Sequence, residues 1–365
     1  MPDPPRDVKP VVPACPAGRN PRADRGLVSL RPDGPEPTMK RFSCPHCGTR
    51  AYFHNLLCLC GEDLTYNPGA RRMVAKAAPC ANRDSLACNW SAYRDGALCQ
   101  SCAMSRVVPV LNVGDNQRLL ASAERAKRWV LANLAEWDWF TDADPGRRPR
   151  FLMLSEHTGG RDQQITMGHA NGEITINVTE ADELIRLKRQ LKLGEQYRSM
   201  VGHFRHEIAH FLFDRLKVLP DFLPAFRAMF GDERADYGAA LKAHYADPRD
   251  PGEDYITSYA TSHPHEDWAE TVAHLLHLTD VADSFCSTHL AMPGVPDDYH
   301  PYAETDAYRL LTIAAEITIA VNDINRALDN SDLYPFVLTV PVRHKIAFAH
   351  GWLQGHLARS DGKAA

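Results

Sequence analysis

The chain has 365 residues, of which 44% are hydrophobic and 24% are charged, and its formal net charge is −5. This length and composition are typical of a globular protein with two or more domains. The sequence contains no apolar run of about eighteen residues, which excludes a helical membrane span.

Residues 1–38 contain ten prolines and little apolar periodicity, so they are predicted to form a disordered arm. The arm lacks the apolar core of a signal peptide, and we therefore expect a reducing, cytoplasmic location. Met39 stands directly before the first cysteine motif and is an alternative start of the natural chain. A second disordered segment is expected at residues 359–365.

Eight of the ten cysteines lie between residues 44 and 102, and their spacing predicts two structural zinc sites in a ribbon region at residues 39–106. Four thiolates close a tetrahedral zinc site. A disulfide framework is the rival interpretation, but it would need a secretory signal. In the first set the second pair is Cys-x-Cys, so His46 or His54 could replace one thiolate there. The first set is Cys44, Cys47, Cys58 and Cys60, and the second set is Cys80, Cys88, Cys99 and Cys102.

The ribbon region carries nine Lys and Arg residues against four Asp and Glu, a net charge of +5. A basic region suggests nucleic-acid binding. The charge is spread over two metal sites whose thiolates add negative charge, however, so the electrostatic footprint is weak. We therefore expect a structural ribbon, or one that docks a protein partner, and no nucleic-acid partner.

Residues 107–358 are predicted to form a mostly helical, zincin-like domain with a small sheet, so the fold class is α+β. Strands are predicted at 150–154, 164–167 and 173–178, and the last two flank the hairpin turn Asn171-Gly172. We assign residues 173–178 to the edge of the sheet, where a substrate backbone could pair. Apolar residues at helical spacing predict helices at 117–140, 180–193, 196–218, 235–244, 265–279 and 303–328.

The helix predicted at 196–218 contains the sequence His-Glu-Ile-Ala-His, which begins at His206. His206 and His210 lie four residues apart, so both imidazoles project from one helix face and can hold one metal ion. Glu207 beside them can take a proton from an activated water. The metzincin form of the third ligand is excluded, because Phe213 and Leu216 stand where Gly and His would be needed.

Glu266, on the helix predicted at 265–279, is the preferred third zinc ligand. Pro264 suits a first helical turn, and acidic residues suit the positive end of the helix dipole. Glu270 lies one turn later on the same face, where it could orient a ligating histidine. The helix is largely apolar, so buried carboxylates on it need partners. Glu233 is a rival ligand, at a distance from His210 close to that used by thermolysin-like enzymes but without their Asn-Glu opening.

Three further histidines lie near these motifs. His203 shares the metal-binding face one turn earlier, and His274 and His277 continue the Glu266 stripe. We interpret all three as hydrogen-bonded packing residues in preference to proton-transfer groups. His203 is kept as a candidate for a supporting role behind the metal ligands.

The motifs also resemble those of known families. His-Glu-x-x-His followed by Tyr-x6-Glu-x-x-Ala-Glu resembles gluzincin peptidases of the lethal-factor and Mlc-titration-factor type. This resemblance implies that Glu266 binds zinc and that Tyr259 helps to stabilise the oxyanion, whereas Glu270 matches the lethal-factor pattern alone. From Met39 almost to its end, the chain resembles a bacterial family of zinc-ribbon proteins described as zinc-binding metallopeptidases. The matching motifs are Phe42-x-Cys-Pro-x-Cys-Gly48, Cys80-x7-Cys88-Asn89-Trp90, residues 202–210, residues 231–238 and His263-Pro-x-Glu-Asp-Trp-Ala-Glu270.

Together these features predict a zinc peptidase with one catalytic and two structural zinc ions, acting on a peptide or protein substrate. Zinc on the two histidines and Glu266 would lower the pKa of a water toward about 7. Glu207 would be the general base, and Tyr259 would help to stabilise the oxyanion. The alternative is a non-catalytic or latent scaffold whose ribbons contact a protein or a nucleic acid. Intact Glu207 and Tyr259 argue against a scaffold, which needs neither residue.

Overall fold

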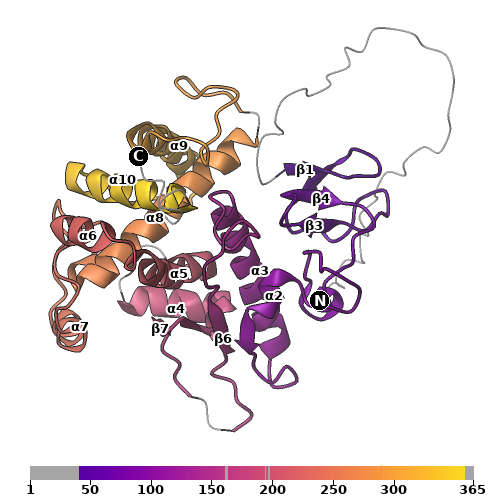
Figure 1. Cartoon of the computed structure of the whole chain (residues 1–365), viewed down its shortest axis with the longest axis horizontal. Coiled ribbons are helices and arrows are strands. Elements are labelled where there is room, and N and C mark those ends of the chain that lie inside the picture. Colours follow the sequence, from indigo (N-terminus) through magenta and orange to yellow (C-terminus); the bar gives the residue numbers. More distant parts are fainter. Residues whose placement is uncertain (1–40, 161–162, 194, 196–197, 289, 358–365) are drawn as a thin grey trace, which may run out of the picture. The chain divides into compact units, whose positions relative to one another are not determined.

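The computed structural model describes residues 41–160, 163–193, 195, 198–288 and 290–357. The predicted disordered segments at 1–38 and 359–365 lie outside these residues. The described fold is α+β, with an N-terminal ribbon region followed by a mostly helical domain that contains a four-stranded sheet (Figure 1). None of the described helices has both the length and the apolar character needed to cross a membrane.

The ribbon region is built from short antiparallel strand pairs, β1 with β2 and β3 with β4. Gly48 and Gly61 each follow a cysteine pair with φ angles of +73° and +88°, a conformation that glycine adopts at little cost and that folds the backbone back tightly. The elements are β1 (Arg41–Ser43), β2 (Arg50–Tyr52), β3 (Thr65–Asn67), β4 (Arg72–Val74), α1 (Arg83–Leu86), α2 (Gln100–Ala103) and β5 (Ser105–Val107).

The larger sheet has the strand order β5-β6-β8-β7. Strands β5, β6 and β8 run parallel, and β7 is antiparallel to β8. Because β5 pairs with β6, the predicted domain boundary at residue 106 falls inside a strand of this sheet. The other strands are β6 (Arg150–Leu154), β7 (Gly168–Ala170) and β8 (Glu173–Asn177).

The predicted turn at Asn171-Gly172 does join two antiparallel strands, but residues 164–167 are not a strand and the edge assignment is wrong. Asn171 and Gly172 both have positive φ angles, +54° and +82°, as the tight two-residue turn between paired strands requires. β8 lies between β6 and β7, so residues 173–178 are internal and the edge strand is β7. β7 begins at Gly168, just after the predicted strand at 164–167. The physical reason is that alternating β-rich residues predict a strand without showing how many neighbours it has.

The helical domain follows the predicted order, with shifted ends and two additional helices. The predicted helices correspond to α3, α4, α5, α7, α8 and α9, whereas α6 and α10 were not predicted. Pro224 and Pro341 lie in the first turns of α6 and α10, where proline is tolerated although it usually marks a helix break. The bounds are α3 (Asn116–Ala135), η1 (Val178–Ala181), α4 (Glu183–Leu193), α5 (Met200–Leu216), α6 (Phe222–Phe230), α7 (Tyr237–Ala246), η2 (Tyr259–Thr261), α8 (Pro264–Cys286), α9 (Ala307–Ala327) and α10 (Val340–Gln354).

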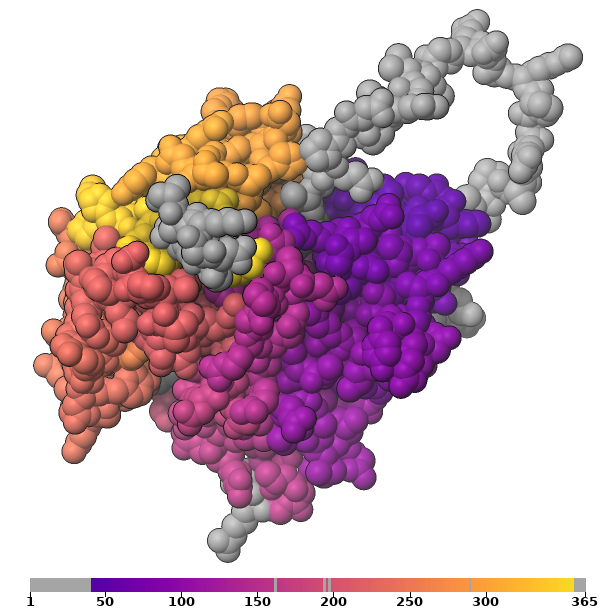
Figure 2. Space-filling view, in the orientation of Figure 1, coloured from indigo at the N-terminus to yellow at the C-terminus, as the bar shows by residue number. Residues whose placement is uncertain are grey.

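Helix α3 joins the ribbon region to the helical domain. Its Arg128 side chain donates to Asn89 Oδ1 at 3.1 Å, and the Trp129 ring meets Phe53 edge to face at 5.2 Å. In the other direction, Trp129 and Asn133 donate to the two carboxylate oxygens of Asp280 on α8, at 2.8 and 3.1 Å. One continuous apolar core therefore runs from the ribbons through α3 into the helices. Figure 2 shows α10 (yellow) and residues near 300 (orange) at the molecular surface.

Candidate metal centre

Helix α5 carries two histidines on a half-buried face. Ser199 caps the start of the helix, because its side chain accepts a hydrogen bond from the Gly202 amide at 3.0 Å. Most of its apolar side chains, such as Ile208, are buried. His206 and His210 remain 16% and 14% exposed and are therefore accessible to a ligand.

The start of helix α8 brings a carboxylate to the same place. His263 caps the helix, because its Nδ1 accepts from the His265 amide at 3.1 Å, and Pro264 occupies the first position. Glu266 thus lies in the first turn. The Trp268 indole donates to the Ala209 carbonyl of α5 at 2.9 Å, which joins the two helices directly beside the histidines.

His206, His210 and Glu266 converge on one point, since one donor atom of each lies within 4.8 Å of the others. His206 Nε2 is 3.0 Å from Glu266 Oε2 and 3.2 Å from His210 Nε2, and His210 Nε2 is 3.5 Å from the same carboxylate oxygen. Glu266 is 1% exposed. Burial raises its pKa, but the two imidazoles outweigh this effect, and the pKa of Glu266 lies well below its usual value.

The chemistry of this donor set fits zinc. Two imidazole nitrogens and one carboxylate oxygen are a ligand set of catalytic zinc sites, which leave the fourth position open. His206 Nδ1 lies 2.8 Å from Glu270 Oε1, and a proton donated from Nδ1 to this carboxylate would leave Nε2 free to bind a metal. Glu270 Oε2 in turn accepts from Thr257 Oγ1 at 2.8 Å, which fixes the carboxylate that orients the histidine.

Glu207 lies beside the three converging side chains and is 7% exposed. Its Oε2 atom is buried and has no hydrogen-bond partner among the described residues. Burial raises the pKa of Glu207 above its ordinary value. A buried carboxylate oxygen without a partner is costly, and a water or substrate atom between it and the histidines would satisfy it.

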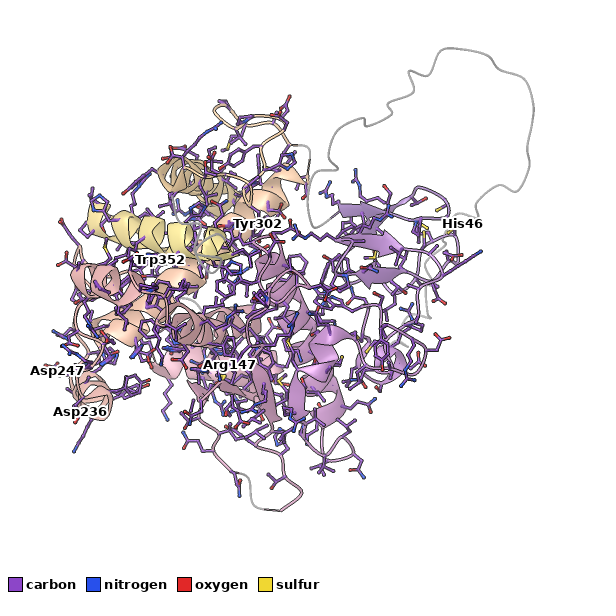
Figure 3. The ribbon with its side chains drawn as sticks, viewed as in Figure 1. His46, Arg147, Asp236, Asp247, Tyr302 and Trp352 are labelled. Atoms are coloured by element: carbon purple, nitrogen blue, oxygen red, sulfur yellow. The ribbon has the colours of Figure 1, made fainter. Side chains whose placement is uncertain are left out.

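Two tyrosines lie beside this cluster, and the sequence predicts only one of them as a site residue. Tyr259, on η2, has its ring centroid 5.9 Å from that of His206, and its hydroxyl makes no hydrogen bond with described residues. Burial raises the pKa of Tyr259. Tyr237, which was not predicted, donates its hydroxyl to Glu266 Oε1 at 2.6 Å. Asp236, labelled in Figure 3 at the start of α7, places Tyr237 by accepting from the Ala239 amide at 3.0 Å.

The sequence gives only an indirect signal for Tyr237. It lies in the stretch 231–238, which resembles a motif of a metallopeptidase family, but the resemblance implies no role for this residue. No spacing rule points to it, because it precedes Glu266 by 29 residues.

Several other candidate residues have partners outside the cluster. Glu233, the rival ligand, accepts from Arg227 Nε at 2.8 Å. His203 Nε2 lies 2.9 Å from Glu180 Oε2, and Glu180 also binds Arg189 and Arg198. His274 Nδ1 lies 2.9 Å from the Tyr334 hydroxyl, and His277 stacks on the Tyr334 ring.

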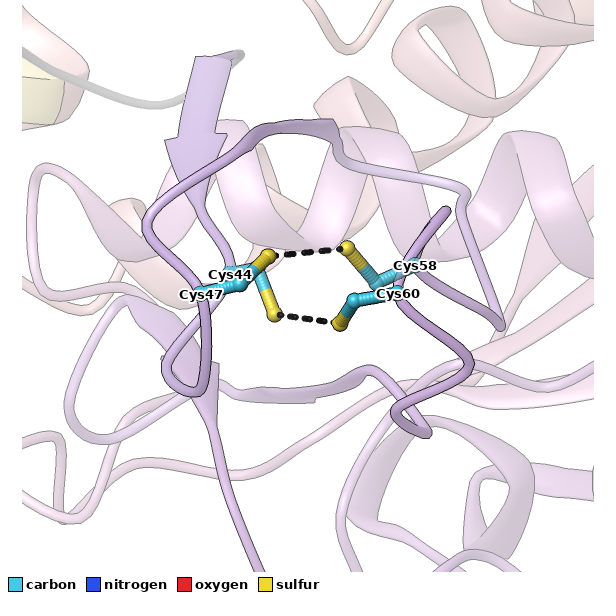
Figure 4. A group of neighbouring side chains, drawn as sticks. All are labelled: Cys44, Cys47, Cys58 and Cys60. Atoms are coloured by element: carbon cyan, nitrogen blue, oxygen red, sulfur yellow. Dashed lines mark hydrogen bonds between the residues drawn. The ribbon is translucent and has the colours of Figure 1, made fainter. Parts of the chain in front are cut away.

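The first cysteine set is gathered as its spacing suggests. The Cys44 and Cys60 sulfurs are 3.9 Å apart, and those of Cys47 and Cys58 are 3.6 Å apart (Figure 4). Tetrahedral zinc with Zn–S bonds of about 2.3 Å would hold its sulfurs about 3.8 Å apart, so the spacing fits. Neither His46 nor His54 belongs to this group. His46 is exposed (Figure 3), and His54 packs 5.3 Å from the Trp129 ring.

The second cysteine set is fully buried. Cys88 Sγ lies 3.6 Å from Cys99 Sγ and 3.7 Å from Cys102 Sγ, and Cys80 Sγ accepts from the Cys99 amide at 3.2 Å. All cysteines in the described ranges are free thiols, so the disulfide interpretation has no support there. Four converging sulfurs with amide donors again fit a closed zinc site.

Comparison with known proteins gives a family for most of the chain. Residues 116–352 match the model of a family described as "Putative zinc-binding metallo-peptidase", and residues 41–79 match that of a zinc-ribbon domain. Uncharacterized proteins of Mycobacterium bovis and of Mycobacterium tuberculosis are 36% identical to this chain over 326 residues, which covers 86% of this chain and 94% of each relative. No solved structure matches the chain.

Proposed function

The chain belongs to the family of zinc-binding metallopeptidases whose model spans residues 116–352, and we propose that it hydrolyses peptide bonds in a peptide or protein substrate. The observation that carries this proposal is the convergence of His206, His210 and Glu266 next to the unpartnered carboxylate oxygen of Glu207. A purely structural metal site has no use for such an oxygen, whereas hydrolysis needs a base there.

We assign one zinc ion to His206, His210 and Glu266 and one to each cysteine set. When bound at the histidines, zinc supplies Lewis acidity, which polarises a substrate carbonyl and acidifies water. The cysteine sites are closed by four thiolates and stabilise the fold. For the ribbon region we propose a structural role or a role in docking a protein partner.

The reaction adds water across the peptide bond, and each neighbouring side chain has one task. Glu207 takes a proton from the attacking water and later passes it to the leaving amine. The hydroxyl of Tyr259 donates to the carbonyl oxygen as negative charge develops on it. Glu270 holds the His206 tautomer, and Tyr237 holds one oxygen of Glu266.

The test incubates purified protein with a diverse peptide library and reads cleavage products by mass spectrometry. Glu207→Gln should lower the cleavage rate by about a hundredfold or more while the zinc content stays at the wild-type value. Glu233→Gln is the matched control, because Glu233 pairs with Arg227 outside the cluster and its loss should leave cleavage intact.

Two results would count against a peptidase. Equal cleavage by wild type and Glu207→Gln would point to a contaminating enzyme. A wild type that is fully loaded with zinc yet cleaves no peptide would favour a scaffold that acts through partners of its ribbons.

A further inference from the structure

A cavity of about 780 Å³ lies between the ribbon region, helix α3 and the C-terminal end of α8. Residues 52–55 of the ribbon form one wall, Arg125 and Arg128 of α3 form another, and Ser284 and Thr288 come from the end of α8 and beyond. None of the three candidate metal clusters contributes a residue to it. The proposed metal sites therefore do not account for the residues that line this cavity.

Three guanidinium groups line the cavity, those of Arg41, Arg125 and Arg128, and no acidic side chain lines it. None of the three forms an ion pair with a carboxylate in the described part of the chain, although most other arginines there do. Arg128 is 1% exposed, and its Nη1 is buried without a hydrogen-bond partner among the described residues. The charge of Arg128 is partly balanced, because it acts on the Cys88 thiol of the second cysteine set. Arg41 and Arg125 have no carboxylate partner in the described part of the chain, and neighbouring guanidinium groups of this kind bind anions.

The rest of the lining is polar and aromatic. Hydroxyl groups come from Ser122 on α3 and from Ser284 at the end of α8, and Tyr52 and Trp129 supply aromatic surface. The C-terminal end of α8 carries only about half a negative charge, which three full positive charges outweigh. His54 adds no charge, because burial, followed by the nearby arginines, lowers its pKa to about 3.

We propose that this cavity binds a small organic molecule that carries a phosphate group. Arginine forks match the oxygens of phosphate in pairs, and every cation in the lining is arginine. The volume lies within the range of about 300–1,000 Å³ that is usual for small-molecule sites. Inorganic phosphate would fill little of it, and the aromatic side chains offer contact area for an organic part.

The test is calorimetric titration of the full, zinc-loaded chain with AMP, adenosine and inorganic phosphate, three probes that bind zinc weakly. AMP should bind saturably to one site, and inorganic phosphate should bind more weakly at the same site. Arg125→Gln should weaken AMP binding about tenfold. Arg125 is exposed and has no carboxylate partner among the described residues, so this change should not disturb the fold, and an unchanged zinc content checks that.

The matched control is Arg72→Gln, which removes another exposed, unpaired arginine of the described chain, outside the cavity. AMP affinity should stay at the wild-type value in this variant. The proposal is overturned if AMP does not bind, if adenosine binds as tightly as AMP, or if both variants weaken AMP binding equally.

Discussion

Two of the three proposed metal ligands, Glu266 and His206, are held by hydrogen bonds to the atoms that face away from the metal position. Glu266 presents Oε2 to the histidines while its Oε1 accepts from Tyr237, and His206 presents Nε2 while its Nδ1 contacts Glu270. Glu266 and His206 are therefore oriented before a metal arrives, which reduces the conformational entropy lost on binding.

Tyr237→Phe should weaken zinc binding at the histidine site by about 10-fold to 100-fold, because it leaves one oxygen of a buried carboxylate without its donor. Competition against a chromogenic chelator measures this. Tyr245→Phe is the control, since Tyr245 is 64% exposed. Equal zinc affinity in wild type and Tyr237→Phe would show that the hydroxyl does not support the ligand.

His274 should make the protein less stable in mild acid. Burial lowers its pKa from 6.5 to about 4, so the folded state keeps the ring neutral while the unfolded state binds a proton. The stability that this residue contributes is complete above pH 6.5 and is lost as pH falls toward 4, by up to about 3 kcal/mol. In urea unfolding between pH 7 and 5, His274→Gln should lose less stability than wild type. His344→Gln, at an exposed position, should follow wild type.

At the level of residues, the sequence was most informative where chemistry depends on local spacing. His206 and His210 are one helical turn apart, and Glu266 and Glu270 are also one turn apart, so each pair could be predicted to share a face. Tyr237 could not be predicted in this way. Its contact with Glu266 depends on how α7 packs near the start of α8, which is a tertiary relation without a sequence period.

At the level of elements, the site depends on the pairing of α5 with α8. The Trp268 indole donates to the Ala209 carbonyl and lies against the α6 side chains Phe222 and Phe226. This contact fixes the distance between the helix that carries the histidines and the helix that carries Glu266.

Trp268→Phe should destabilise the fold by about 1–3 kcal/mol and also weaken zinc binding at the histidines, because it removes this bond between the two helices. Trp137→Phe is the matched control. Its buried indole donates to the Tyr302 carbonyl at 2.9 Å, so it should cost similar stability and leave zinc affinity unchanged. Chemical unfolding and chelator competition on both variants separate the two effects. Equal loss of zinc affinity in both would mean that only general stability matters.

The features that could not be predicted are those that depend on how an element packs against neighbouring elements. Residues 173–177 form a strand as expected, yet their internal position follows from pairing with β7, a strand of only three residues. Helix α6 contains nine residues with Phe222, Phe226 and Phe230 at helical spacing, but Pro224 lies inside it and proline usually marks a break. Its identity as a helix depends on Phe222 and Phe226 packing against Trp268.

At the level of the whole molecule, the two cysteine sets differ in how deeply they are buried and how much they contact the rest of the chain. In the first set Cys47 and Cys60 are exposed, whereas all four members of the second are buried. Beside the second set, Arg128 of α3 donates to the Ala87 carbonyl, and the chain leads from Cys102 directly into β5.

On the proposed zinc assignment, Cys88→Ser and Cys47→Ser should each cost about one zinc ion per chain. Only Cys88→Ser should speed hydrogen exchange at the amides of β6, because only the second set anchors the strand that pairs with β6. Exchange by mass spectrometry, with zinc measured on the same samples, checks both. Similar exchange at β6 in the two variants would contradict this difference.

The pairing of β5 with β6 also limits how far the chain could be shortened from its N-terminus. A shortened chain that began at residue 108 would keep every residue of the metal centre, but β6 would become an open edge with unpaired backbone groups. Open edges of this kind recruit strands from other molecules, and the shortened chain should therefore aggregate. The helical domain thus completes its sheet with a strand that follows the second cysteine set, so the two parts of the chain should fold only when they are produced together.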